Sequence, residues 1–103
     1  MNEPMSLLVI VVPESLEDPL VDELLLHPEW VSGFDTQAVE GHGSGRAQKS
    51  GAERVRGRAR RVRVEMAITE PNARALLGHL KRVMPQQDVV YWMQGLAEFG
   101  RFA

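Results

Sequence analysis

Hydrophobic and polar positions follow two different periods along the chain, and its first part shows one stretch of each. Residues 7–12 form an unbroken apolar run, rich in β-branched side chains, too short for a helix and stopped by Pro13. Such a run predicts a buried strand. Over residues 16–26, leucines recur at spacings of three and four with acids on the other side, which predicts an amphipathic helix.

The same two patterns return further along. Residues 34–40 alternate and predict a second strand, and the glycine- and serine-rich start of residues 41–57 predicts a long loop. Alternation is clearest over residues 58–68, which predicts a third strand. A second amphipathic helix is expected over residues 70–84 and a fourth strand over residues 88–94.

Residues near the helix ends suggest how these elements start and stop. Ser15 is a good N-cap for the first helix, but Asp18 followed by Pro19 is the better pairing of cap and first helical residue. At the other end of this helix, we expect His27 to cap the last carbonyls and to complement the helix dipole. His79, beside the apolar stripe of the second helix, is expected to pack in a partly exposed position.

The order β-α-β-β-α-β predicts an α+β, ferredoxin-like fold, with residues 1–103 as a single domain. Its four strands form one antiparallel sheet, and both helices cover the same face. The strand at residues 7–12 is nevertheless apolar on both faces, and Val90 and Trp92 extend the apolar surface in the last strand. We therefore expect the uncovered face of the sheet to meet other subunits.

Composition narrows the chemistry. The chain has no cysteine, which excludes disulfides, thiolate ligands and thiol nucleophiles. No serine lies in a nucleophile motif, so we expect no enzyme. The apolar runs are too short to cross a membrane and the N-terminus lacks the basic residues of a signal peptide, which predicts a cytoplasmic protein. The net charge of −2 is uneven, because most basic residues lie between Arg46 and Arg63.

Four segments carry a resemblance to a known family: LLVIVVPESLEDPLVDELLLHP from Leu7, VSGF at residues 31–34, VEGHGSG at residues 39–45 and VRGRARRVRVEM at residues 55–66. Through them the chain resembles the PII-like, or nitrogen-regulatory-protein-like, signalling proteins. It is most similar to an uncharacterised branch often encoded beside heavy-metal efflux pumps. The resemblance implies a PII-like homotrimer whose T-loop, here residues 41–57, reaches a membrane metal-efflux transporter and responds to small ligands.

Two departures from the nucleotide-binding members of that family argue against ATP binding of the usual PII type. Those proteins follow the loop-entry glycines with a phosphate-contacting glutamine, whereas Ser44 and Gly45 follow here. Their glycine-rich, lysine-containing loop before the last strand is replaced by residues 84–88. CutA, a trimeric relative associated with divalent-cation tolerance, shares the topology but has a different loop and last strand.

Ligands for a divalent metal ion are available where the second strand enters the loop. Glu40 and His42, with Glu53 further along, could supply nitrogen and oxygen atoms, and flanking glycines would let the backbone close around the ion. The alternative is that His42 is an ordinary exposed loop residue. Zinc sites normally gather three or four ligands, so trimer symmetry would help by bringing copies of these groups together.

A dense run of arginines offers a second kind of site. Guanidinium groups match phosphates and carboxylates bidentately, so the run predicts binding of small anions or an acidic partner. Its structural alternative is a solvated strand face paired with neighbouring acids. The negative net charge and the lack of interleaved aromatic residues argue against nucleic acid. The candidate anion- or ligand-binding residues are Gly41, Gly43, Arg46, Arg54, Arg56, Arg58 and Arg61.

These features favour a PII-like regulatory or sensor protein that binds a metal ion or small ligand and modulates a heavy-metal efflux transporter. Two alternatives stay open. One is a CutA-like protein that binds or buffers divalent metal without a transporter. The other is a basic module for anions or nucleotides, whose affinity would fall steeply with salt.

Overall fold

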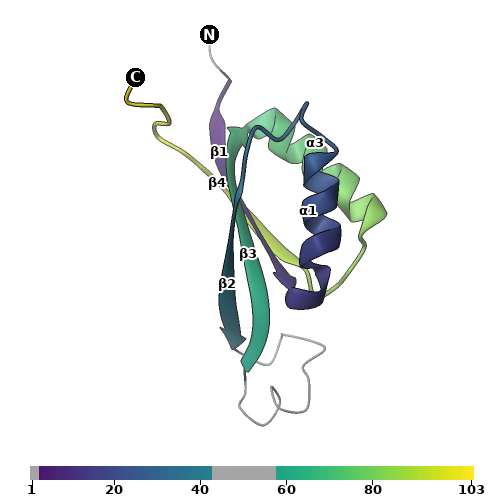
Figure 1. The fold of residues 1–103 in the computed structure, drawn as a ribbon. Helices are drawn as coiled ribbons and strands as arrows, with labels where there is room; N and C mark the ends of the chain where they lie inside the picture. Colours follow the sequence, from purple (N-terminus) through teal and green to yellow (C-terminus); the bar gives the residue numbers. More distant parts are fainter. Residues whose placement is uncertain (1–2, 43–57) are drawn as a thin grey trace.

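Strands and helices follow one another in the order β-α-β-β-α-β in the computed structural model, which describes residues 3–42 and 58–103. The strands lie in the order β2-β3-β1-β4, and each neighbouring pair is antiparallel. Figure 1 shows both longer helices on one face of this sheet. The predicted ferredoxin-like arrangement is therefore confirmed. The elements are β1 (Met5–Pro13), η1 (Glu14–Leu16), α1 (Glu17–Leu25), β2 (Asp35–His42), β3 (Arg58–Thr69), α3 (Glu70–Val83) and β4 (Val90–Gly95).

The hydrophobic core lies between the helices and the two central strands. Side chains alternate along a strand, so every second residue of β1 and β3 points towards the helices. The apolar stripes of α1 and α3 pack onto these residues, as their periodicity predicts. The buried members of the core are Leu8, Ile10, Val12, Leu20, Leu24, Val31, Val62, Val64, Met66, Ile68, Ala73, Leu76 and Leu80.

The first helix begins differently from the prediction. The short 3-10 helix η1 leads directly into α1, whose N-cap is Leu16, with no side-chain capping bond. Neither Ser15 nor Asp18 therefore caps this helix. Pro19 is the third residue of α1, where a backbone N–H would have no partner within the helix, so the proline removes no hydrogen bond. Neither α1 nor α3 is long and apolar enough to cross a membrane.

The sheet face without helices is buried at its centre and apolar at its rim. Val9 and Val11 are only 2% and 3% exposed, although α1 and α3 both lie on the other face. Arg63 faces Val11 across β1 and β3, and its guanidinium lies 5.9 Å from the ring centre of Trp92. Val90 and Trp92 keep about two-fifths of their surface exposed, at 37% and 41%.

Strands β2 and β3 form a ribbon that extends beyond the helices (Figure 1). The pairing begins with Asp35 opposite Glu65 and ends with His42 opposite Arg58. Strand β2 thus includes Gly41 and His42, which were predicted to belong to the loop. The remainder of the predicted loop, residues 43–57, lies outside the described residues.

Candidate metal site

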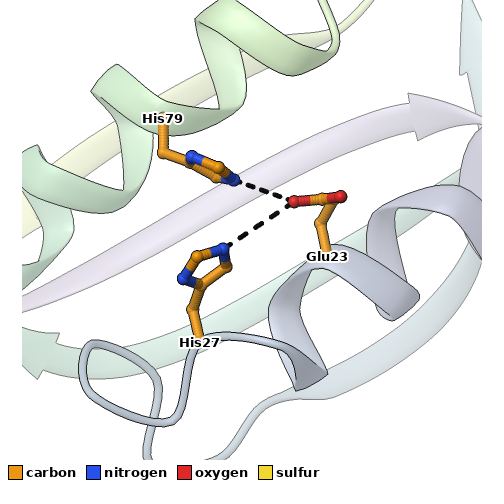
Figure 2. Close-up of side chains that lie close together, drawn as sticks. All are labelled: Glu23, His27 and His79. Carbon is orange, nitrogen blue, oxygen red and sulfur yellow. Dashed lines mark hydrogen bonds and ion pairs between the residues drawn. The ribbon is translucent and has the colours of Figure 1, made fainter.

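Two histidines and a glutamate from distant parts of the chain converge beside the helices. Glu23 lies in α1, His27 follows the end of that helix, and His79 lies in α3. Their possible ligand atoms all lie within 4.8 Å of one another, and Figure 2 shows both imidazole rings turned towards the carboxylate. Among residues 3–42 and 58–103, no other three acidic or histidine side chains have their possible ligand atoms this close together.

Helical spacing places Glu23 and His27 on the same side of α1, because residues four apart are neighbours on a helix surface. The helical turn continues to His27, whose backbone N–H donates to the carbonyl of Leu24 at 3.2 Å. The carbonyl of His27 then accepts the backbone N–H groups of Trp30 and Val31, at 3.1 and 3.0 Å. These bonds turn the chain back towards the imidazole and so bring Trp30 against it.

Three neighbours fix the orientation of the His27 ring. Trp30 stacks on it, with ring centres 4.8 Å apart and planes only 12° from parallel. The ring of His79 meets it edge-on at 4.3 Å. Nδ1 of His27 donates to the carboxylate of Glu29 at 2.8 Å, and this bond is the main cause that lowers the pKa of Glu29.

His79 joins the two helices. Leu76 and Leu80, three residues before it and one after it on α3, are buried in the core and hold the helix in place. Nε2 of His79 donates to the carboxylate of Glu23 on α1 at 2.8 Å. The polar bond lies beside the apolar stripe that anchors α3, so the helix packing sets the position of the ring.

The geometry suits a small cation with mixed nitrogen and oxygen ligands. Oε1 of Glu23 lies 2.8 Å from Nε2 of His79 and 3.9 Å from Nε2 of His27. A tetrahedral zinc ion with bonds of about 2.0–2.1 Å places its ligand atoms about 3.3 Å apart, so side-chain shifts of roughly 1 Å would complete the site. The three side chains are 27%, 21% and 19% exposed, which leaves an approach from solvent.

The sequence-predicted metal ligands lie elsewhere. Glu40 and His42 are both exposed near the end of β2, two residues apart and hence on the same side of the strand. Their partners across the ribbon are Arg60 and Arg58. Glu53 lies outside the described residues. The structure therefore places two of these three candidates on the same side of β2, and the site itself stays a prediction.

The predicted anion-binding residues are only partly described. Gly41 is buried within β2, and Arg58 is the first residue of β3. Arg61 is 3% exposed, and its Nη1 donates to the carbonyl of Arg60 at 3.5 Å. The remaining candidates, Gly43, Arg46, Arg54 and Arg56, lie outside the described residues.

Sequence reasoning missed the cluster because it gave its histidines other roles. His27 lies at the helix end as predicted, but its ring is bonded to Glu29 and faces Glu23 instead of capping carbonyls. His79 occupies the partly exposed position predicted for it and in addition binds Glu23. One feature of the sequence could have indicated the cluster: Glu23 and His27 are four residues apart on a helix that covers the same face of the sheet as α3. Nothing in the pattern specified which turns of the two helices meet.

The comparisons with known proteins concern the family and the fold. The family described as "Protein of unknown function (DUF3240)" matches residues 3–103. The crystal structure of a DUF3240 family protein from Shewanella baltica OS155 is 22% identical, with a TM-score of 0.75 over 100% of both chains. No curated protein matches the sequence.

Two further solved structures show the same fold at lower identity. CPII, a nitrogen regulatory PII-like protein from Thiomonas intermedia K12 bound to ADP, AMP and bicarbonate, is 18% identical. Its TM-score is 0.68, with 95% of this chain and 94% of that chain covered. CutA from Synechococcus elongatus PCC7942 is 11% identical, with a TM-score of 0.66 over 92% of this chain and 79% of that one. These similarities confirm the predicted PII-like fold.

Proposed function

The chain belongs to the family described as "Protein of unknown function (DUF3240)", and we propose that it is a PII-like regulatory protein that senses a divalent metal ion at Glu23, His27 and His79. One observation carries the proposal. Two imidazole nitrogens and a carboxylate oxygen, from two helices, lie within 4.8 Å of one another. This is a ligand set that zinc and neighbouring transition metals use.

The surroundings of the cluster favour reversible binding. Three protein ligands leave one position of a tetrahedral ion for water, and the side chains are partly exposed, so an ion can enter and leave. The core beneath the helices consists of apolar side chains and includes none of the three ligands. An ion would strengthen the connection between α1 and α3, and a ligand that favours one helix arrangement shifts the population towards it. That is the physical basis of sensing.

The proposal extends to assembly and partner. We propose a cytoplasmic, non-enzymatic homotrimer that modulates a heavy-metal efflux transporter. The exposed apolar rim at Val90 and Trp92 supports a subunit contact, and the fold shared with CPII, a regulatory protein, supports signalling. The ribbon formed by β2 and β3 extends beyond the helices, and the predicted T-loop, residues 41–57, is the proposed contact with the partner.

A second candidate function keeps the metal and omits the transporter. It is the CutA-like alternative, a protein that binds or buffers divalent ions by itself, and the fold shared with CutA is compatible with it. In addition, the exposed positions of Glu40 and His42 support the predicted second metal site with Glu53. The arginine run stays a predicted anion site. Co-purification with a membrane transporter that depends on added metal would favour sensing over buffering.

Titration of the purified protein with zinc, cobalt, nickel and copper ions tests the metal site. We expect saturable binding by calorimetry. His79→Ala should weaken it by more than the roughly 10–100-fold that loss of an outer-sphere partner costs, whereas the matched variant His42→Ala should bind as the unsubstituted protein does. Binding lost in His42→Ala and kept in His79→Ala would move the site to the strand end. Absence of binding by all four ions would refute metal sensing.

A further inference from the structure

His27 presents its two ring nitrogens to different carboxylates. Nδ1 lies 2.8 Å from Oε2 of Glu29, within hydrogen-bond distance. Nε2 faces Oε1 of Glu23 at 3.9 Å, which is too long for a hydrogen bond. One side of the ring is therefore engaged, and the other side points into the cluster (Figure 2).

This arrangement determines which nitrogen carries the proton of the neutral ring. An ionised carboxylate can only accept hydrogen bonds, so the bond to Glu29 requires the proton on Nδ1. Nε2 then carries a lone pair, which is the form that a metal ion binds. The stack on Trp30, at 4.8 Å and 12°, keeps the ring plane in the orientation that aims this lone pair at the cluster.

We infer that Glu29 is a positioning residue for the metal site: it holds His27 as an Nε2 ligand and makes the site select ions that prefer imidazole. This inference rests on the proposed function. Glu29 would not touch the ion. Its carboxylate would act through the ring, in the way that carboxylates behind metal-bound histidines fix the tautomer and raise the basicity of the ligand.

The class of ion follows from the ligand count. With His27 held in this form, and with the ion displacing the proton that Nε2 of His79 donates to Glu23, two of the three ligands are imidazole nitrogens, which suit zinc, copper, nickel and cobalt. Magnesium and calcium require oxygen ligands, and the cluster offers one carboxylate. The site therefore takes a transition-metal ion of the zinc-like class, and magnesium should not compete for it.

Variants of Glu29 separate this role from mere packing. Glu29→Ala removes the acceptor, and Glu29→Gln keeps the shape but offers either an oxygen or an NH₂ group to Nδ1. We expect zinc affinity to fall by about 10–100-fold in Glu29→Ala, less in Glu29→Gln, and not at all in Asp22→Asn, a neighbouring exposed acid on α1. Excess magnesium should leave zinc binding unchanged.

Nitrogen NMR of the His27 ring in the metal-free protein supplies a readout that a packing role would not move. We expect the Nδ1–H tautomer in the unsubstituted protein and a mixture of tautomers in Glu29→Ala. Zinc bound with unchanged affinity by Glu29→Ala, or a tautomer indifferent to that substitution, would overturn the inference and leave the proposed function standing. A wild-type protein that binds no metal would overturn both.

Discussion

Two regions of the molecule place a histidine near a glutamate, and they differ in what holds the side chains. Near the end of β2, Glu40 and His42 are exposed and lie two residues apart, on the same side of the strand. Beside α1 and α3, Glu23, His27 and His79 meet through helix packing, a stacked indole and a bond between helices. Ligands held by neighbouring side chains lose less freedom when an ion binds. The residues of the helical cluster are held in this way, although His79 is far from Glu23 and His27 in the sequence.

The largest expected effect tests the packing that supports the helical cluster. Leu76→Ala should lower the free energy of unfolding by about 2–5 kcal/mol, because it leaves a cavity beneath α3 where a side chain was fully buried. Urea unfolding of both proteins measures this difference in the free energy of unfolding. Leu25→Ala is the matched control, since Leu25 is 66% exposed on α1, and surface changes usually stay within about 0.5 kcal/mol. Equal losses in both variants would contradict the assignment of α3 to the core.

A smaller effect sharpens the contrast between the two regions through metal-linked stability. An ion that binds only the folded protein, at a free concentration of 100 times its dissociation constant, should raise the free energy of unfolding by about 2.7 kcal/mol. Unfolding with zinc and with a chelator, at one protein concentration, measures this gain. His79→Ala should lose it and His42→Ala should keep it. The reverse result would place the ion at the strand end.

Much of the fold was predictable because its patterns are local and strong. The apolar run of β1, the alternation of β3 and the apolar stripe of α3 each indicate one type of element. The order of these elements then leaves few possible topologies. The start of α1 was not predictable, because its N-cap Leu16 is the last residue of a 3-10 helix and the predicted capping residues, Ser15 and Asp18, do not cap it. A cap adds about 1 kcal/mol, which the burial of Leu20 and Leu24 can outweigh.

The candidate site was less predictable than the fold. It depends on where α1 and α3 lie side by side, which is set by the fit of many core side chains and not by any single period. The pairing of His79 with Glu23, 56 residues apart, is a product of that fit. Glu29 and Trp30 reach the imidazole of His27 because the chain turns back after that residue. The backbone hydrogen bonds of this turn have no sequence signature.

The smallest expected effect concerns the carboxylate behind His27. The hydrogen bond from Nδ1 lowers the pKa of Glu29 below its ordinary value of 4.5. A group whose pKa is depressed by folding stabilises the folded protein above its ordinary pKa, and this stabilisation is lost as the pH falls towards the folded value. In His27→Ala, acid titration followed by carboxyl-carbon NMR should show the pKa of Glu29 rising towards 4.5. His42→Ala should leave it lowered. If the pKa of Glu29 is the same with and without His27, the largely exposed carboxylate stays in water and does not bond to the ring. The helical cluster would then lack the carboxylate that holds His27 from outside.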